Sequence, residues 1–195
     1  MRQSKEVMAE SRTRILSNAA RLFRERGINA VSVVDVMQAS GMTHGGFYKH
    51  FASKDQLVSE AVKSAFDMIT SEIDREAETM GLPVAVSRYV NRYVSEWHLN
   101  NAGYGCPVAA LGGEIARSGH AVKTAYDAGV EAVRDRVASG AFGNHADARD
   151  RAVMLLMSMT GTVVTARATE NPELRKTILA AGAQSARQQL EHGPH

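Results

Sequence analysis

The residues that follow Gly41 are of the types that bind nucleic acid. Their polar or amphipathic members are Thr43, His44, Tyr48, Lys49 and His50. Hydroxyl groups and cations hold phosphates, and side chains near the N-terminus of a short helix can reach base edges in the major groove. The chemistry that this stretch favours is therefore non-covalent binding of DNA.

Four other residues of the stretch indicate what kind of helix would present these groups. Phe47 and Phe51 are four apart and can pack inward, whereas Gly45 and Gly46 leave a bare surface that a ligand could approach closely. Each glycine costs a helix about 1 kcal/mol relative to alanine. Such a helix persists only if packing or a ligand compensates for this loss.

A tight turn precedes this helix, because Gly41 can adopt the left-handed conformation that a short connection between helices needs. Before the turn, Ser32 is suited to begin a helix, with Asp35 three positions on in an approximate capping box. The spacing predicts a helix-turn-helix over residues 32–51. A tight corner between two helices, without any ligand, is the alternative that the spacing leaves open.

Cys106 is the second candidate for chemistry. It directly precedes Pro107, so we expect it at or near the N-cap of a helix, where the positive helix end lowers the pKa of a thiol. Gly103 and Gly105 should leave the approach open, which favours a reactive thiol. The alternative is a small, buried, unreactive residue.

Aromatic residues supply a third candidate. Tyr89, Tyr93 and Trp97 follow one another at spacings of four and would share one stripe of a helix. Such a stripe either packs in the core or lines a pocket with its polar tips.

The elements that must position these groups are all helical, since no alternating strand pattern persists. The first helix is expected over 12–26, capped by Ser11 or Thr13 and ended by Gly27, and the second begins at Ser32. A short third helix, over 43–50, should be capped by Thr43. Further helices are expected over 53–79, 83–100, 107–118, 121–139, 146–169 and 172–191. The fold class is thus all-α with about nine helices, divided into a three-helix DNA-binding head over 1–55 and a ligand-sensing and dimerisation body over 56–195.

The charge distribution supports an anionic partner for the head. The whole chain carries a formal net charge of +2 over 195 residues. Residues 1–50 hold 8 Lys or Arg and 4 acidic residues, which gives +4 and leaves −2 for the rest. A single cysteine excludes a disulfide within the chain and fits a reducing compartment, and no apolar run has the length of a membrane span. We therefore expect a cytoplasmic protein that does not contact a membrane.

Enzyme classes find little support in the sequence. It has no paired carboxylates at suitable spacing, no glycine-rich phosphate loop and no Ser/His/Asp pattern. A metal site built from His98, Cys106 and His120 is conceivable but has no motif behind it. We expect no catalysis, no cofactor and no metal.

One long stretch is similar to a known family. From Thr13-Arg-Ile-Leu through Ala19-Ala-Arg-Leu-Phe to Phe47-Tyr-Lys-His-Phe-Ala-Ser-Lys-Asp-Gln-Leu57, the sequence closely resembles the N-terminal domain of the TetR family of bacterial transcriptional repressors. The resemblance implies an all-α homodimer that binds a pseudo-palindromic DNA operator. It also implies a variable body that binds a small-molecule effector, which releases the repressor from DNA.

The resemblance assigns DNA contacts to individual positions. Thr43 and His44 would contact phosphate or base edges, Tyr48 and His50 would contact phosphates, and Lys49 would contact either. The complete set that the resemblance implies is Ser32, Thr43, His44, Gly45, Tyr48, Lys49, His50 and Lys54. Met37, Ser40, Met42 and Gly46 depart from the family's usual residues, and Gly46 removes a side chain that could touch a thymine methyl.

The body resembles one subgroup of the family through Gly105-Cys-Pro-Val-Ala-Ala-Leu-Gly-Gly-Glu114. Some members of that subgroup respond to electrophiles or oxidants through cysteine, so the resemblance implies release either by a small molecule or by modification of Cys106. The residues expected to serve the effector are Tyr89, Tyr93, Trp97 and Cys106. An activator of the same family and an interaction module that does not bind DNA remain as alternatives.

The last two helices are the expected dimer interface. Ala152, Met159, Val163 and Ala166 would line it on one helix, with Gly161 and Thr162 allowing close approach, and residues 180–183 would do the same on the other. Packing within one chain is the alternative for these residues.

Overall fold

The computed structural model describes residues 2–191, and every regular element within them is helical. In chain order the elements are α1 (Arg2–Arg26), α2 (Val33–Ala39), η1 (His44–Lys49), α3 (Lys54–Met80), α4 (Leu82–Tyr93), α5 (Glu96–Asn100), η2 (Ala102–Tyr104), α6 (Pro107–Ile115), α7 (His120–Val137), η3 (Ala138–Phe142), α8 (Ala148–Ala168) and α9 (Pro172–Glu191). The all-α fold with an N-terminal helix-turn-helix is confirmed.

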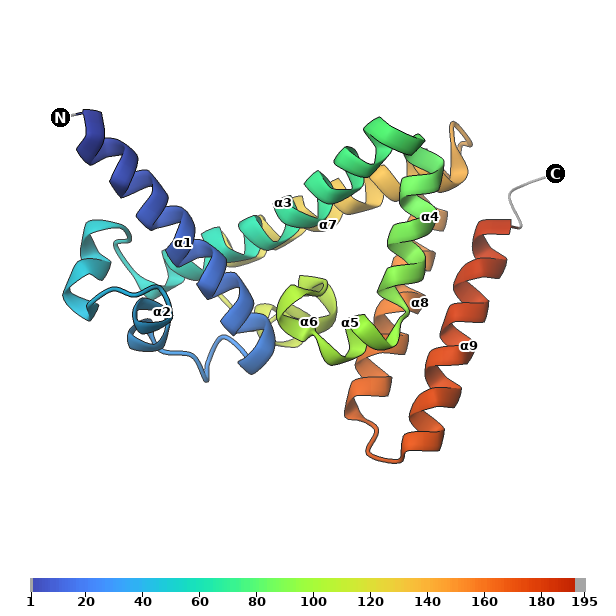
Figure 1. Ribbon diagram of the computed structural model, residues 1–195. Helices are drawn as coiled ribbons and strands as arrows, with labels where there is room; N and C mark the ends of the chain where they lie inside the picture. The colour runs from blue at the N-terminus through green and yellow to red at the C-terminus, as the bar shows by residue number, and fades with distance from the viewer. Residues whose placement is uncertain (1, 192–195) are drawn as a thin grey trace.

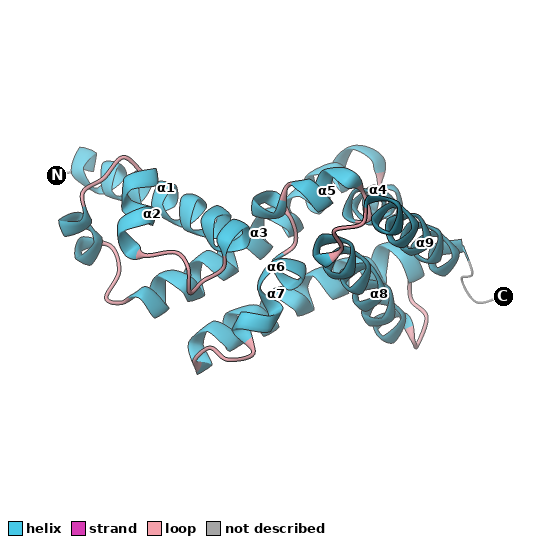
Figure 2. Cartoon of the chain, turned by 90° about the horizontal axis from the view of Figure 1, so that it is seen from below, coloured by secondary structure: helices cyan, strands magenta, loops and turns pink. Residues whose placement is uncertain are grey.

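Two ends of the molecule are joined by two long helices. The head, made of α1, α2 and η1, lies at one end, and the hairpin of α8 and α9 lies at the other (Figure 1). Between them α3 runs beside α7 (Figures 1 and 2). The domain boundary expected after residue 55 falls in the first turn of α3, which packs on both α1 and α7, so it stays a prediction; residues 192–195 lie outside the described residues. No helix of the described residues is both long and apolar enough to cross a bilayer.

The head follows its local sequence chemistry closely. Ser32 forms the expected capping box with Asp35, and Gly41 turns the chain at a φ of +71°. Gly27, at a φ of +89°, ends α1 as expected. The beginning of α1 was predicted wrongly: the helix starts at Arg2 rather than at 12, and Thr13 lies inside it with its hydroxyl donating to the carbonyl of Ala9 at 3.1 Å.

One of the expected helices is divided into two helices in the structure. The helix expected over 83–100 ends at Tyr93, and α5 begins after Ser95, whose hydroxyl accepts the N–H of His98 at 3.3 Å. A serine that caps a new helix competes with continuation of the old one. Trp97 therefore does not share a helix with Tyr89 and Tyr93, and it is half exposed at 50%.

The expected dimer face on α8 is also wrong. Ala152, Met159, Val163 and Ala166 are fully buried within the single chain. Thr162 packs against Gly182 of α9, where a Cβ would overlap the threonine side chain. Helical periodicity marked the apolar stripe correctly, but the stripe faces the chain's own core.

Close packing of α3 on α7 depends on one glycine. A Cβ at Gly129 would overlap the ring of Phe66, which also packs edge-on against Tyr126 at 5.7 Å between ring centroids. The absence of a side chain at position 129 thus lets the buried Phe66 ring lie directly against the backbone of α7.

We predict that Gly129→Ala lowers the free energy of unfolding by about 1–3 kcal/mol, the usual cost of overpacking a core. Gly113→Ala is the matched control, since nothing lies within 4 Å of a Cβ there and alanine favours the helix by up to about 1 kcal/mol. Urea denaturation of both variants checks this, and equal stabilisation by the two substitutions would contradict it.

Candidate DNA interface and effector cavity

The short η1 element divides its side chains as the sequence predicts. Phe47 and Phe51 are buried and stack with ring centroids 5.6 Å apart. The exposed residues of this segment are Thr43, His44, Gly45, Tyr48 and Lys49, and Tyr48 is 70% exposed. Buried aromatic rings thus hold a projecting polar surface in place.

Two details of η1 differ from expectation. It is a 3₁₀ helix rather than an α-helix, which fits the weak helix propensity of its two glycines. Thr43 occupies the N-cap position, but its side chain makes no capping hydrogen bond. The Thr43 hydroxyl is therefore not used to start the helix.

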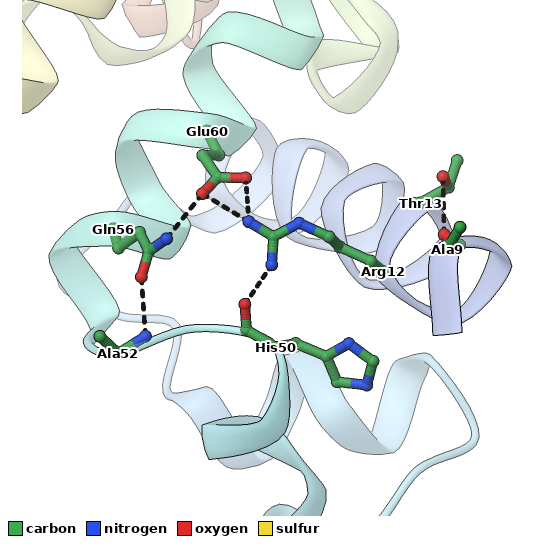
Figure 3. Close-up of polar contacts among 7 residues, drawn as sticks. All are labelled: Ala9, Arg12, Thr13, His50, Ala52, Gln56 and Glu60. Atoms are coloured by element: carbon green, nitrogen blue, oxygen red, sulfur yellow. Dashed lines mark hydrogen bonds and ion pairs between the residues drawn. The ribbon is translucent and has the colours of Figure 1, made fainter. Parts of the chain in front are cut away.

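Arg12 braces the chain just after η1 (Figure 3). Its guanidinium donates to the carbonyl of His50 and to both carboxylate oxygens of Glu60 at 2.6 Å, and it lies 4.3 Å from the centroid of the Phe51 ring. Glu60 also accepts the amide of Gln56 at 2.9 Å, and Gln56 in turn accepts the N–H of Ala52 at 2.7 Å. No local sequence pattern indicates this network, because Arg12 and Glu60 are far apart along the chain.

Three expected DNA contacts are bonded or partly buried within the head. The Lys54 ammonium donates to the carbonyl of Ile28 at 2.8 Å, and the hydroxyl of Ser32 bonds to Asp35 at 2.5 Å. His50 is partly buried, and this burial, followed by the charges of Arg12 and Lys49, lowers its pKa. Lys54 and Ser32 thus hold the loops around η1, whereas the side chains of Tyr48 and Lys49 are exposed and make no such hydrogen bond within the part of the head that the structure describes.

A large apolar cavity lies in the body. Its volume is about 520 Å³, and α3, α4, α6, α7 and α8 all contribute to its wall. The lining residues are Phe66, Tyr93, Cys106, Val108, Tyr126, Val130, Val133, Val153, Leu156, Met157, Thr160, Gly161 and Val164. Its volume falls within the usual range for a small-molecule pocket.

The four residues expected to serve an effector lie close together, but most of them lie outside the large cavity. Tyr89, Tyr93, Trp97 and Cys106 all line a much smaller recess of about 40 Å³. Only Tyr93 and Cys106 also line the large cavity, so they separate the two spaces. The residues that α7 and α8 contribute were missed, because nothing in a single sequence shows which apolar positions leave space between them.

Cys106 is at the N-cap of α6, as expected, but its predicted reactivity is not borne out. The residue is 5% exposed, and burial raises the pKa of its thiol although Tyr93 and the amide groups of Val108 and Ala109 favour the thiolate. A Cβ at Gly105 would overlap His98, and one at Gly103 would lie 2.5 Å from Glu25. The loop before Cys106 is packed, so the open approach expected there is absent.

His98 holds this loop from within. Its Nδ1 bonds the carbonyl of Tyr93 at 2.7 Å, and its Nε2 accepts the N–H of Cys106 at 3.0 Å, so the ring is neutral with the proton on Nδ1. Burial lowers the pKa of His98 to about 4. Both nitrogens are engaged, which leaves none for the metal site considered with Cys106 and His120.

Two hydrogen-bond systems join the cavity wall to the head. Arg24 of α1 is buried and donates to the carbonyl of Gly105 at 3.1 Å, and its burial lowers its pKa to about 10. Glu114, near the end of α6, accepts the N–H groups of Ile28 at 3.2 Å and Asn29 at 3.1 Å in the loop before α2. Helix α6 therefore touches the cavity at Cys106 and the head at Glu114.

Comparison with known proteins matches the head to a family model and the whole chain to solved folds. Residues 15–61 match the family model described as bacterial regulatory proteins, tetR family. The HTH-type transcriptional regulator AcrR of Shigella flexneri is 33% identical over 96 residues, which are 49% of this chain and 45% of that protein. The HTH-type transcriptional repressor KstR2 of Rhodococcus jostii is 39% identical over 71 residues, covering 36% and 34%. The matches thus span half or less of these relatives.

The likeness of fold extends over nearly the whole chain. The TetR-family regulator from Agrobacterium tumefaciens superposes with a TM-score of 0.74, covering 94% of this chain and 97% of that one at 20% sequence identity. The chain therefore shares its overall fold with this regulator.

The low pKa of His98 predicts how stability depends on pH. At pH values above 6.5 the ring is neutral in both states, but between 6.5 and about 4 only the unfolded chain binds the proton. The free energy of unfolding should therefore fall with decreasing pH over this window, by roughly 3 kcal/mol in total for this group. Urea denaturation at a series of pH values measures the decrease.

His98→Gln is the control, because an amide can keep both hydrogen bonds without titrating. Its stability should change less over the same window, and parallel pH profiles for the two proteins would contradict the assignment.

Proposed function

We propose that this chain, whose head matches the tetR family and whose fold is that of TetR-family regulators, is a homodimeric transcriptional repressor released from its operator by a small molecule. The observation that carries the proposal is the projecting polar surface of η1, held by buried aromatic rings and the Arg12 network. A repressor role is supported by the name of the KstR2 relative.

The proposed DNA contacts begin with the exposed residues of η1. Thr43 has an uncommitted cap hydroxyl and His44 lies in the first turn, so both suit contacts to base edges or phosphate. Tyr48 and Lys49 suit phosphates, and Gly45 allows close approach because nothing lies within 4 Å of a Cβ there. Two such heads on a twofold axis would recognise half-sites about 34–36 Å apart in a pseudo-palindrome.

The partly engaged residues have supporting roles in this proposal. Lys54 can reach a phosphate while it bonds Ile28, because an ammonium group has three donors. His50 can donate to a phosphate as a neutral ring. Ser32 acts mainly by fixing the start of α2, since its hydroxyl and its N–H both bond Asp35.

A face of the α8–α9 hairpin opposite the core is the proposed dimer interface. On α8 it comprises Met154, Met157, Gly161, Thr165 and Ala168, and on α9 Leu174, Ile178, Ala181, Ser185 and Gln188. Met157 and Gly161 also line the large cavity, so the proposed interface meets the cavity along these two residues. These positions repeat at spacings of three and four, the pattern of packed helix bundles, and none carries a formal charge. Met154 and Met157 are 65% and 67% exposed, which is unusual for large apolar side chains.

Of the two release routes, occupation of the large cavity has more support than modification of Cys106. The cavity has the volume of a ligand pocket and shares α6 with the head contacts at Glu114. The Cys106 thiol is buried with a raised pKa, and both properties disfavour its reaction with an electrophile.

Operator binding should depend steeply on salt. If Lys49, Lys54 and one arginine of α1 each meet a phosphate in both heads, about six charges are neutralised and log K falls against log salt with a slope of about −5. Lys49→Gln should reduce the magnitude of that slope by about 2. Fluorescence anisotropy with DNA from upstream of the chain's own gene measures both.

Lys63→Gln provides the matched control, because Lys63 is an exposed lysine of α3 paired with Asp67 in the body. A slope near zero for the unmodified protein, or an equal effect of the two substitutions, would overturn the DNA interface.

The dimer face leads to a separate prediction. Met154→Glu should yield a folded monomer at micromolar concentration and weaken operator binding at least 100-fold, because an uncompensated charge in an apolar interface is costly and Met154 does not line the large cavity. Met68→Glu, an exposed methionine of α3, should leave the oligomeric state unchanged. Sedimentation velocity measures the oligomeric state of both variants, and a Met154→Glu protein that stays dimeric would exclude this face.

A further inference from the structure

We propose that the large cavity takes an uncharged, mainly apolar molecule with one hydrogen-bonding group, which bonds to the hydroxyl pair of Tyr93 and Thr160. The inference rests on the proposed function for its regulatory meaning, but the binding itself does not depend on DNA.

The composition of the wall is the first argument. None of the thirteen lining side chains is an acid, a lysine, an arginine or a histidine. Tyr93, Tyr126 and Cys106 are its ionisable members, and burial raises the pKa of each, so they remain neutral at physiological pH. A charged ligand group inside this wall would lose its water without gaining a counter-ion.

The charges nearest to the cavity are already committed. Arg92 and Glu72 line the smaller recess beyond Tyr93 and pair with each other at 3.0 Å. Arg167 donates to the carbonyls of His98 at 2.6 Å and Leu99 at 3.2 Å, and Arg24 donates to Gly105. None of these side chains lines the large cavity, so none serves as a ready partner for an anionic or cationic ligand.

A polar anchor is nevertheless present in the wall. The hydroxyl groups of Tyr93 and Thr160 lie 2.8 Å apart and share one hydrogen bond. Two hydroxyls that share one bond keep a second donor hydrogen and spare lone pairs. A ligand alcohol or carbonyl can bond to this pair, while its apolar part lies against Phe66, Val130 and Val133.

The test uses three probes that differ only in their head group: 1-decanol, decanoate and decylammonium at pH 7. Isothermal titration calorimetry on the full chain, without DNA, should give a dissociation constant for 1-decanol at least 30-fold lower than for either ion. Tyr93→Phe should weaken 1-decanol binding about 2- to 10-fold, the usual value of a neutral hydrogen bond, and leave the weak binding of the ions unchanged.

A second experiment fills the cavity with a larger side chain. Val130→Phe adds a ring inside the cavity and should abolish 1-decanol binding, whereas Val84→Phe, at an exposed position of α4 outside the wall, should not. Equal or tighter binding of either ion, unchanged binding by Val130→Phe, or no binding of 1-decanol would overturn the assignment of the ligand class.

The regulatory role is measured separately. If 1-decanol binds as described but leaves operator affinity unchanged, the ligand class stands and the proposed coupling to DNA fails; if the protein binds no operator at all, the proposed function fails while the calorimetric result is unaffected.

Discussion

The constraint on which the rest of the structure depends is the burial of the irregular chain between Tyr93 and Pro107. Backbone groups buried outside regular helices must find partners or lose the free energy of their hydration. Three side chains from three elements meet this demand here: His98 bonds Tyr93 and Cys106, Arg24 of α1 bonds Gly105, and Arg167 of α8 bonds His98 and Leu99. The head, the cavity wall and the α8–α9 hairpin are thereby tied to one segment.

The contrast between what was predictable and what was not follows from the range of each interaction. Capping by Ser32 and Asp35, the turn at Gly41 and the end of α1 at Gly27 depend on residues a few positions apart, and the sequence predicted all three. The pKa of Cys106 depends on what surrounds it from α1, α4 and α6, and desolvation there outweighs the helix end on which the prediction rested. Likewise, the sequence of an apolar stripe on α8 does not indicate whether the stripe packs in the core of its own chain or against a second chain.

The candidate site shows the same division. The projecting residues of η1 were identified from their types and spacing, because a short helix with two inward phenylalanines leaves few other arrangements. Arg12 was missed, although it contacts His50, Phe51 and Glu60 at once, since its partners are distant in sequence. Tyr93 and Cys106 were predicted to serve the effector, but the position and size of the cavity were not predicted. Empty space arises from the packing of five helices and has no sequence pattern.

The position of α6 gives a physical route from ligand to DNA. A molecule in the cavity would contact Cys106, the residue that begins α6, and Tyr93, whose carbonyl His98 holds. Any displacement of Cys106 acts on Gly105, which is bonded to α1 through Arg24, and any shift of α6 along its axis acts on Glu114, which is bonded to the loop before α2. The first bond ends in α1, and the second ends in the loop that leads into α2, the helix on which η1 packs. If this helix of nine residues moves as one rigid body, a displacement at its cavity end appears at its head end.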